Sequence, residues 1–318
     1  MARSFLPAPC LGILFSIYGL AQIPATITPR SRPPASQPRP ALRSDTSLVV
    51  IPTWVTTAAG ASVTTLNKEN FHVIEDNVEQ PITYFTKDDA PLSIGLLFDA
   101  SGSMRNKMEK ASESVAAFFK TANAEDEFFL VEFNDRAKLT IPFTSDSGEI
   151  YSRVVGTKPT GRTALLDAIQ IALQHMKKAR HTRKAIVIIS DGGDNWSWHS
   201  TRQIRSALLE SDVQLYAMGI FDHEFSSKSP SEDRKGPGLL DELAGPTGGR
   251  HYAVGNLNDL PAISAKIGNG LRNEYLLGYY ATDSGDGKYH RLKVNLALPD
   301  NTPSLHANYR RGYYASYR

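Results

Sequence analysis

The chain has 318 residues, of which 41% are hydrophobic and 21% charged, so it is long enough to bury a core and to form one large domain with a smaller one. Its 35 basic and 33 acidic residues give a formal net charge of +2, and it has no basic stripe with interleaved aromatic residues, which argues against nucleic-acid binding. Cys10 is the single cysteine, which excludes an intramolecular disulfide framework.

Residues 1–21 are typical of a secretory signal peptide. Arg3 provides a positive start, residues 11–20 are mostly apolar, and a Gly-Leu-Ala sequence ends the segment with small residues at the cleavage positions. We expect the leader to be removed together with Cys10, which leaves no stable membrane insertion. A leader kept as an uncleaved anchor is the alternative. The expected location is secreted, periplasmic or in the cell envelope.

Residues 22–44 are rich in Pro, Ser and Arg and contain few large apolar side chains. Such a composition does not support a packed core, and it predicts a disordered linker that holds the folded part away from a membrane or an export machinery. Disorder without a selected role is the alternative.

Both ends of the remaining chain carry short strand patterns. The N-terminal runs are residues 48–56, 71–75 and 82–86, and the C-terminal runs are residues 275–282, 289–298 and 305–314. Three strands are marginally stable by themselves, so we expect residues 45–90 and 273–318 to pair into one β-sandwich. The alternative is two independent flaps, each of which would leave an apolar face unburied.

The middle of the chain, residues 91–272, alternates strand and helix patterns. This alternation predicts an α/β domain with a doubly wound, mainly parallel sheet. Asn134 and Asp135 mark a hairpin between two of the strands. Expected helices lie near residues 107–122, 165–179, 201–210 and 257–271, and further strands at 128–133, 138–143, 185–190 and 213–220.

An apolar run at residues 93–98 stops at Asp99, and Ser101 and Ser103 follow at alternate positions. The run reads as a strand buried on both faces, and open parallel sheets bind their ligands at the carboxyl ends of such strands. One carboxylate and two hydroxyls provide the hard oxygen ligands that Mg²⁺ prefers. An ordinary serine-rich turn is the alternative for this motif when it is taken by itself.

Two further loops carry oxygen ligands at equivalent places. Residues 184–190 form a second buried-strand run that ends at Asp191 and a pair of glycines. Between the two runs, a glycine-containing loop places Thr163 just before an amphipathic helix. Three such loops are hard to explain as separate turns.

With these motifs the chain resembles the von Willebrand factor type A (VWA) family. The metal-ion-dependent adhesion site (MIDAS) of that family is built from Asp-x-Ser-x-Ser, a distant Thr and a more distant Asp. The resemblance implies that the metal ligands are Asp99, Ser101, Ser103, Thr163 and Asp191. It also implies that the hydroxyls ligate directly and that at least one carboxylate acts through bound water.

The flanking segments 70–82 and 271–280 resemble the bacterial VWFA-related group first described from acidobacteria. With the core motifs, this resemblance covers nearly everything after the first forty-odd residues. The group carries no general biochemical function that could be transferred, so the resemblance informs the fold more than the activity.

The resemblance implies a secreted, metal-dependent protein-binding module of the adhesion type. A bound Mg²⁺, with Mn²⁺ or Ca²⁺ as alternatives, would keep one coordination position open for an Asp or Glu of a protein partner. A second hypothesis is an accessory or assembly factor of an exported or membrane complex. The third, a Mg²⁺-dependent hydrolase, is disfavoured because no Gly-x-Ser-x-Gly elbow or placed histidine accompanies Ser101 or Ser103. We therefore predict no enzymatic activity.

Two other groups of residues carry side chains that could bind a metal or a partner. The sequence Asp222-His223-Glu224 has metal-capable side chains, but three consecutive residues point in different directions, so we interpret it as a polar loop. Trp196 and Trp198 follow Asp191 and either form a rim around the binding surface or pack against the next helix.

Overall fold

A computed structural model describes residues 47–87, 89–221, 236–281, 286–299 and 303–315. The expected leader and linker, and the sequence Asp222-His223-Glu224, lie outside the described residues. None of the described helices is both long and apolar enough to cross a membrane.

A six-stranded sheet with the order β10-β9-β8-β5-β6-β7 forms the centre of the middle region. Five of its strands run parallel, and the hairpin partner β7 runs antiparallel to β6. The predicted doubly wound, mainly parallel α/β fold is confirmed, including the hairpin at Asn134 and Asp135. The strands are β5 (Leu92–Asp99), β6 (Glu127–Phe133), β7 (Ala137–Thr144), β8 (Arg183–Ser190), β9 (Val213–Ile220) and β10 (His251–Val254).

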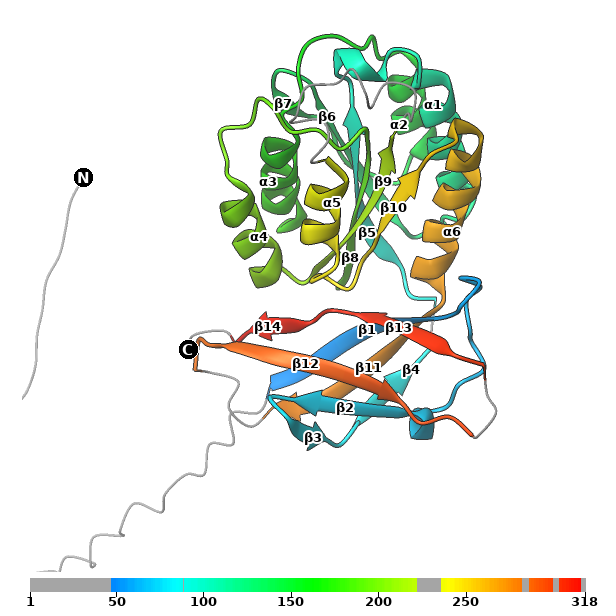
Figure 1. Ribbon diagram of the computed structural model, residues 1–318, viewed down its shortest axis with the longest axis vertical. Coiled ribbons are helices and arrows are strands. Elements are labelled where there is room, and N and C mark those ends of the chain that lie inside the picture. The colour runs from blue at the N-terminus through cyan, green and yellow to red at the C-terminus, as the bar shows by residue number, and fades with distance from the viewer. Residues whose placement is uncertain (1–46, 88, 222–235, 282–285, 300–302, 316–318) are drawn as a thin grey trace, which may run out of the picture. The chain divides into compact units, whose positions relative to one another are not determined.

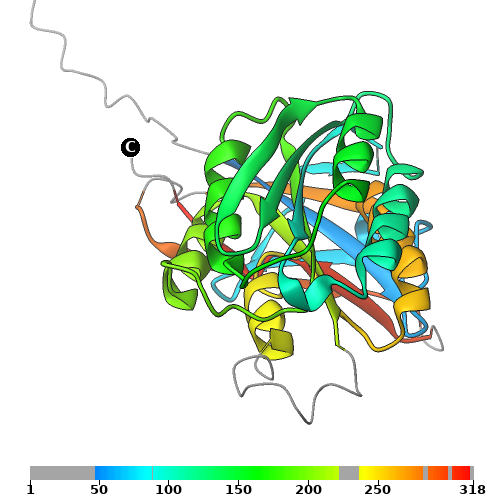
Figure 2. The same cartoon turned by 90° about the horizontal axis from the view of Figure 1, so that it is seen from above.

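Helices cover both faces of this sheet (Figure 1). One face packs against α1 (Met108–Phe119), α2 (Ser147–Val155) and α6 (Leu260–Arg272). The other face packs against α3 (Leu165–Met176), α4 (Thr201–Glu210) and α5 (Gly236–Ala244). In Figure 2 the teal α1 and the orange α6 lie side by side. Every residue of β5 is buried between the two helical layers, which explains its unbroken apolar pattern.

The two ends of the chain form a β-sandwich of two four-stranded sheets, with the orders β13-β1-β11-β4 and β14-β12-β2-β3. The pairing of β1 with β11 places Ser47 opposite Ala281 and Trp54 opposite Glu274. The predicted shared sandwich is therefore present, whereas the exact domain boundaries remain a prediction. Its strands are β1 (Ser47–Thr57), β2 (Phe71–Glu75), β3 (Val78–Gln80), β4 (Tyr84–Thr86), β11 (Glu274–Ala281), β12 (Tyr289–Leu296), β13 (Leu305–Tyr309) and β14 (Gly312–Tyr314).

One predicted strand is wrong. Residues 305–314 form two strands in different sheets, because the chain changes sheet at Arg310. The Arg310 guanidinium pairs with Asp212 and donates a hydrogen bond of 2.9 Å to the carbonyl oxygen of Val50. Gly312 then passes so close to β12 that an added Cβ would lie 2.3 Å from the His290 carbonyl oxygen.

A buried ion pair joins the sandwich to the middle region. The Arg183 guanidinium lies 3.0 Å from the Glu274 carboxylate, and their side chains are 6% and 0% exposed. The Gln214 amide donates a second hydrogen bond of 2.7 Å to Glu274. Desolvation raises the pKa of Glu274, so these two donors are needed to keep a charge at this depth.

Candidate metal centre

The first loop of the candidate site begins where β5 ends. The Asp99 side chain is fully buried, and its Oδ1 atom accepts a hydrogen bond of 2.8 Å from the Ser101 amide. The 3₁₀ helix η2 (Gly102–Met104) starts directly after Ser101, and this turn brings the Ser101 and Ser103 hydroxyl oxygens to 3.0 Å from each other. Ser101 is buried and Ser103 is exposed, so this loop reaches solvent at Ser103.

The third loop brings a second carboxylate close to the first. Asp191 directly follows β8, and its negative charge acts on Asp99. Burial raises the pKa of Asp99 to about 7, and repulsion from Asp191 adds to the rise, while hydrogen bonds from Ser101 and Ser190 act in the opposite direction. The Ser190 hydroxyl provides the shortest of these bonds, 2.6 Å to Asp99 Oδ2.

The second loop is tied to both of the others. The Gly102 amide donates to the Gly161 carbonyl oxygen at 3.0 Å, and the Thr160 amide donates to that of Ala100 at 2.8 Å. Gly161 has a φ of +80°, a left-handed conformation that glycine adopts without strain. These contacts hold the Thr163 loop against the Asp99 loop.

Thr163 itself connects to the third loop. Its amide donates to Asn195 Oδ1 at 3.0 Å, and its carbonyl oxygen accepts from the amides of Asn195 and Trp196 at 3.0 and 3.1 Å. The structure therefore joins all three predicted loops through backbone contacts at one edge of the sheet. The five predicted ligands are Asp99, Ser101, Ser103, Thr163 and Asp191.

The donor set fits a hard divalent cation. The described residues contain no group of three or more His, Cys, Asp or Glu side chains placed to hold a metal, so an ion here needs hydroxyl or water ligands as well. Two carboxylates and three hydroxyls supply the oxygen ligands typical of Mg²⁺. The electrostatics agree, because burial and repulsion from Asp191 raise the pKa of Asp99, and a divalent cation would stabilise its charged form.

Three residues that contribute to this site are not among those predicted from the sequence. Ser190 binds Asp99, and its place directly before Asp191 was a usable signal. Asn195 holds the Thr163 loop. Lys107 lies at the start of α1, with its ammonium nitrogen 3.1 Å from Asp191 Oδ2 and its side chain 13% exposed. No sequence signal links Lys107 to Asp191, because the two residues are 84 positions apart.

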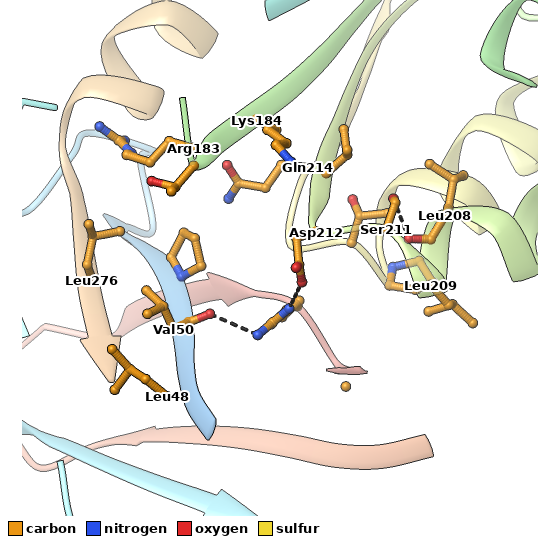
Figure 3. Close-up of a pocket in the computed structure, with 17 residues that line it drawn as sticks. Leu48, Val50, Arg183, Lys184, Leu208, Leu209, Ser211, Asp212, Gln214 and Leu276 are labelled. Atoms are coloured by element: carbon orange, nitrogen blue, oxygen red, sulfur yellow. Dashed lines mark hydrogen bonds and ion pairs between the residues drawn. The ribbon is translucent and has the colours of Figure 1, made fainter. Parts of the chain in front are cut away.

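The cavity drawn in Figure 3 lies away from these loops. It has a volume of about 310 Å³, and its lining includes Lys184 near the beginning of β8, whereas Asp191 follows the end of that strand. Seven residues of strand separate the two positions by roughly 23 Å. The Arg310 and Asp212 side chains in the cavity wall already pair with each other. We therefore place the candidate site at the loops.

Comparison with known proteins shows which domains this chain is similar to. The family model described as "von Willebrand factor type A domain" matches residues 94–193. An uncharacterized protein of Borreliella burgdorferi is 27% identical over 190 residues, which cover 52% of this chain and 54% of that protein. Another, from Synechocystis, is 23% identical over 138 residues, covering 42% of this chain and 33% of that protein. The chain thus spans about half or less of the curated relatives that it matches.

Similar solved structures include a BatB protein from Bacteroides thetaiotaomicron, with 20% identity and a TM-score of 0.45 over 56% of this chain and 98% of that chain. Another is a mussel byssus protein, proximal thread matrix protein 1, whose structure is described as having a zinc-occupied MIDAS motif. It is 18% identical with a TM-score of 0.49, over 62% of this chain and 50% of that chain.

The fold and the three loops define a doubly wound α/β domain with a ligand edge at the carboxyl ends of its parallel strands. Residues 94–193 of the chain match the von Willebrand factor type A domain. Its assignment to the acidobacterial-type group within this family stays a prediction.

Proposed function

We propose that this protein is a secreted, metal-dependent protein-binding module. Asp99, Ser101, Ser103, Thr163 and Asp191 would hold Mg²⁺, with Mn²⁺ or Ca²⁺ as alternatives, and the ion would supply a Lewis-acidic position for an Asp or Glu of a partner protein. The expected location in the cell envelope or outside the cell rests on the leader at residues 1–21.

The observation that carries this proposal is the pair of neighbouring carboxylates, Asp99 and Asp191, beside hydroxyls of two other loops. Asp99, Ser101 and Thr163 are at most 4% exposed, whereas Ser103 is exposed. The three buried residues form the base of the site, which we call its floor, and Ser103 lies on the side that faces solvent. A ligand can therefore approach from one side, as a capture site for a side chain of a large partner requires.

The same floor argues against nucleophilic catalysis. The Ser101 and Ser103 hydroxyls bond to each other, and no hydrogen bond in the described residues connects either hydroxyl to a histidine. A hydroxyl with no base beside it has the low reactivity of a free alcohol. This supports a binding function over hydrolysis.

Metal binding is tested by calorimetric titration of Mg²⁺, Mn²⁺, Ca²⁺ and Zn²⁺ into wild-type protein and Asp99→Ala. We expect the variant to lose binding and keep the fold, because the ion lies at the edge of an already packed sheet. Glu113→Ala is the matched control, since its half-exposed carboxylate on α1 lies outside the three loops. Equal Mg²⁺ binding by Asp99→Ala and wild type would show that the assigned site is wrong.

Partner binding is tested by capture from the native envelope with and without chelator. We expect Thr163→Ala to weaken partner binding more than Mg²⁺ binding, since direct ligation by this threonine accompanies the high-affinity state in the family that the chain resembles. A fixed subunit that co-purifies even in excess chelator would instead support the accessory-factor hypothesis.

A further inference from the structure

The loop after Asp191 exposes two tryptophans beside the candidate metal site. The Trp198 side chain is 92% exposed and that of Trp196 is 47% exposed, while Trp54, the third tryptophan of the chain, is 1% exposed. Trp196 is tied to the site, because its amide donates to the Thr163 carbonyl oxygen. The sequence left two alternatives for these tryptophans, a rim around the binding surface or packing against the next helix. The second alternative is wrong for Trp198, because its side chain is exposed.

This exposure is not the result of a loosely held loop. Asp167, in the first turn of α3, accepts hydrogen bonds of 3.1 Å from the amides of Trp198 and His199, and the His199 ring lies 2.6 Å from the same carboxylate. Asp194 accepts a bond of 2.6 Å from the Ser197 hydroxyl and one of 3.2 Å from the Leu166 amide. The fold therefore fixes a large apolar side chain in solvent, an arrangement typical of contact sites for a partner.

An arginine is fixed in the same place. The Arg162 guanidinium carbon lies 3.7 Å from the centroid of the Trp196 ring, which is the geometry of a cation–π stack. Arg162 is exposed and forms no ion pair within the described residues. Stacking leaves the edge of the planar guanidinium free to bind a carboxylate with two parallel hydrogen bonds.

The charges around this arginine favour an acidic partner. The carboxylates nearby are engaged within the protein, since Asp135 accepts from the Arg162 amide at 2.9 Å and Asp167 and Asp194 hold the tryptophan loop. Arg105, two residues after Ser103, is also exposed. The exposed guanidinium groups of Arg105 and Arg162 therefore place positive charge next to Thr163, beside the exposed carboxylate of Asp135.

We propose that Arg162, Trp196 and Trp198 form a second contact site for an acidic segment of a protein partner. One carboxylate of the segment ligates the metal, a second pairs with the stacked Arg162, and an apolar side chain of the partner packs against Trp198. This inference rests on the proposed metal-dependent function, and it specifies that the partner carries two acidic residues and an apolar one near them.

The test uses synthetic peptides and the intrinsic tryptophan fluorescence of the full chain. Twelve-residue peptides are selected from a bead-displayed random library in Mg²⁺, and the best binders are remade with each acidic residue replaced by its amide. Because Trp54 is buried, a change in emission on binding reports Trp196 and Trp198. We expect binders with two acidic residues, a blue shift on binding, and loss of that shift in Trp198→Phe.

Arg162→Gln separates the two carboxylate contacts. We expect this variant to bind peptides with two acidic residues about tenfold more weakly. In this variant, replacing the acidic residue that pairs with Arg162 should no longer change the affinity. Binding should still be lost when chelator is added. Both test residues are exposed, so the variants should fold. The controls are Arg291→Gln, at an exposed arginine on the sandwich, and Tyr280→Ala, at a side chain that is 54% exposed there. Neither control should change the affinity.

The outcomes distinguish this inference from the proposed function. Chelator-sensitive peptide binding with no fluorescence shift and with unchanged affinity in Arg162→Gln and Trp198→Ala would overturn the second contact site and leave the metal-dependent function intact. Binding of the same peptides in excess chelator would overturn the proposed function. Binding of acidic oligosaccharides but no peptides, with the same dependence on Arg162, would overturn the assignment to a protein partner.

Discussion

Asp99→Asn should stabilise the metal-free protein at neutral and alkaline pH. In the native state the pKa of Asp99 is raised by burial and by Asp191 to about 7, from an ordinary value of 3.8. Between these two pH values the native state holds a proton that the unfolded state has released. Stability therefore falls as the pH rises through this window, and at about 1.4 kcal/mol per pKa unit the total loss is about 4 kcal/mol.

The asparagine variant has no charge and so avoids this loss. It gives up the hydrogen bond that Asp99 Oδ2 accepts from Ser190, which costs about 1 kcal/mol. Relative to wild type, we expect the variant to be less stable by about 1 kcal/mol at pH 4 and more stable by about 3 kcal/mol at pH 8. The two stability curves should therefore cross.

Urea unfolding in excess chelator, repeated from pH 4 to pH 8.5, measures both curves. Adding Mg²⁺ at pH 8 should raise the unfolding midpoint of wild type and leave that of Asp99→Asn unchanged, because binding to the native state stabilises it. Parallel stability curves for the two proteins, with no crossing, would refute the electrostatic reasoning. A Mg²⁺ response in the variant would refute the assignment of Asp99 as a ligand.

Three further perturbations test other parts of the structure. Lys107→Met should bind Mg²⁺ about tenfold more tightly in calorimetric titration, because its ammonium group no longer competes for Asp191. Unchanged or weaker binding would contradict this. Glu274→Ala should lower the free energy of unfolding by about 3–5 kcal/mol in a denaturant titration, because it leaves the buried Arg183 charge unpaired, and a loss below about 1 kcal/mol would show that the pair is dispensable. Deletion of residues 273–318 should make the N-terminal strands sensitive to limited proteolysis, and unaltered protection would mean that the two ends of the chain are stabilised independently.

Continuous patterns in the sequence predicted the elements that set the fold. The strands β5 and β8 each contain a continuous run without polar side chains, at residues 94–98 and 185–189, because both of their faces are covered, and each ends at a polar loop of the site. The sandwich shared by the two ends of the chain was predictable from the shortage of strands at either end, whereas the particular pairing of β1 with β11 was not predicted. In these cases the local sequence pattern agrees with the burial in the folded protein, so the sequence alone is enough to predict the element.

Elements with few buried residues were not predictable. The helix α2 buries Ile150 and Val154 among polar neighbours. Its N-cap is Asp146, whose side chain accepts hydrogen bonds from the amides of Gly148 and Glu149. The N-cap aspartate lies in a polar stretch whose composition is typical of a loop. Two apolar positions are too few to show the periodicity of a helix. The break at Arg310 was missed because it depends on Asp212 and Val50, distant partners that no local pattern reveals.

Parts of the candidate site could not be predicted from the sequence, because they also depend on contacts between residues that are distant in the chain. The motif positions were visible, but the raised pKa of Asp99 depends on how deeply its side chain is buried and on how closely its loop approaches Asp191. The stacking of Arg162 on Trp196 joins residues on two loops that the backbone bonds of Thr163 hold together. Sequence spacing predicts which loops meet at a sheet edge, whereas charge and stacking depend on distances that the finished fold sets.

The pairing of Ser47 with Ala281 also has a consequence for the order in which the chain folds. At roughly 5–20 residues per second, the residues that separate β1 from β11 take on the order of ten to forty seconds to synthesise. All strands of the central sheet are made in that interval, while Ile51 and Val55 of β1 still lack the sheet that buries them. We expect the metal-binding loops to be assembled first, and the first strand of the sandwich to wait as an exposed apolar segment until the last strands arrive.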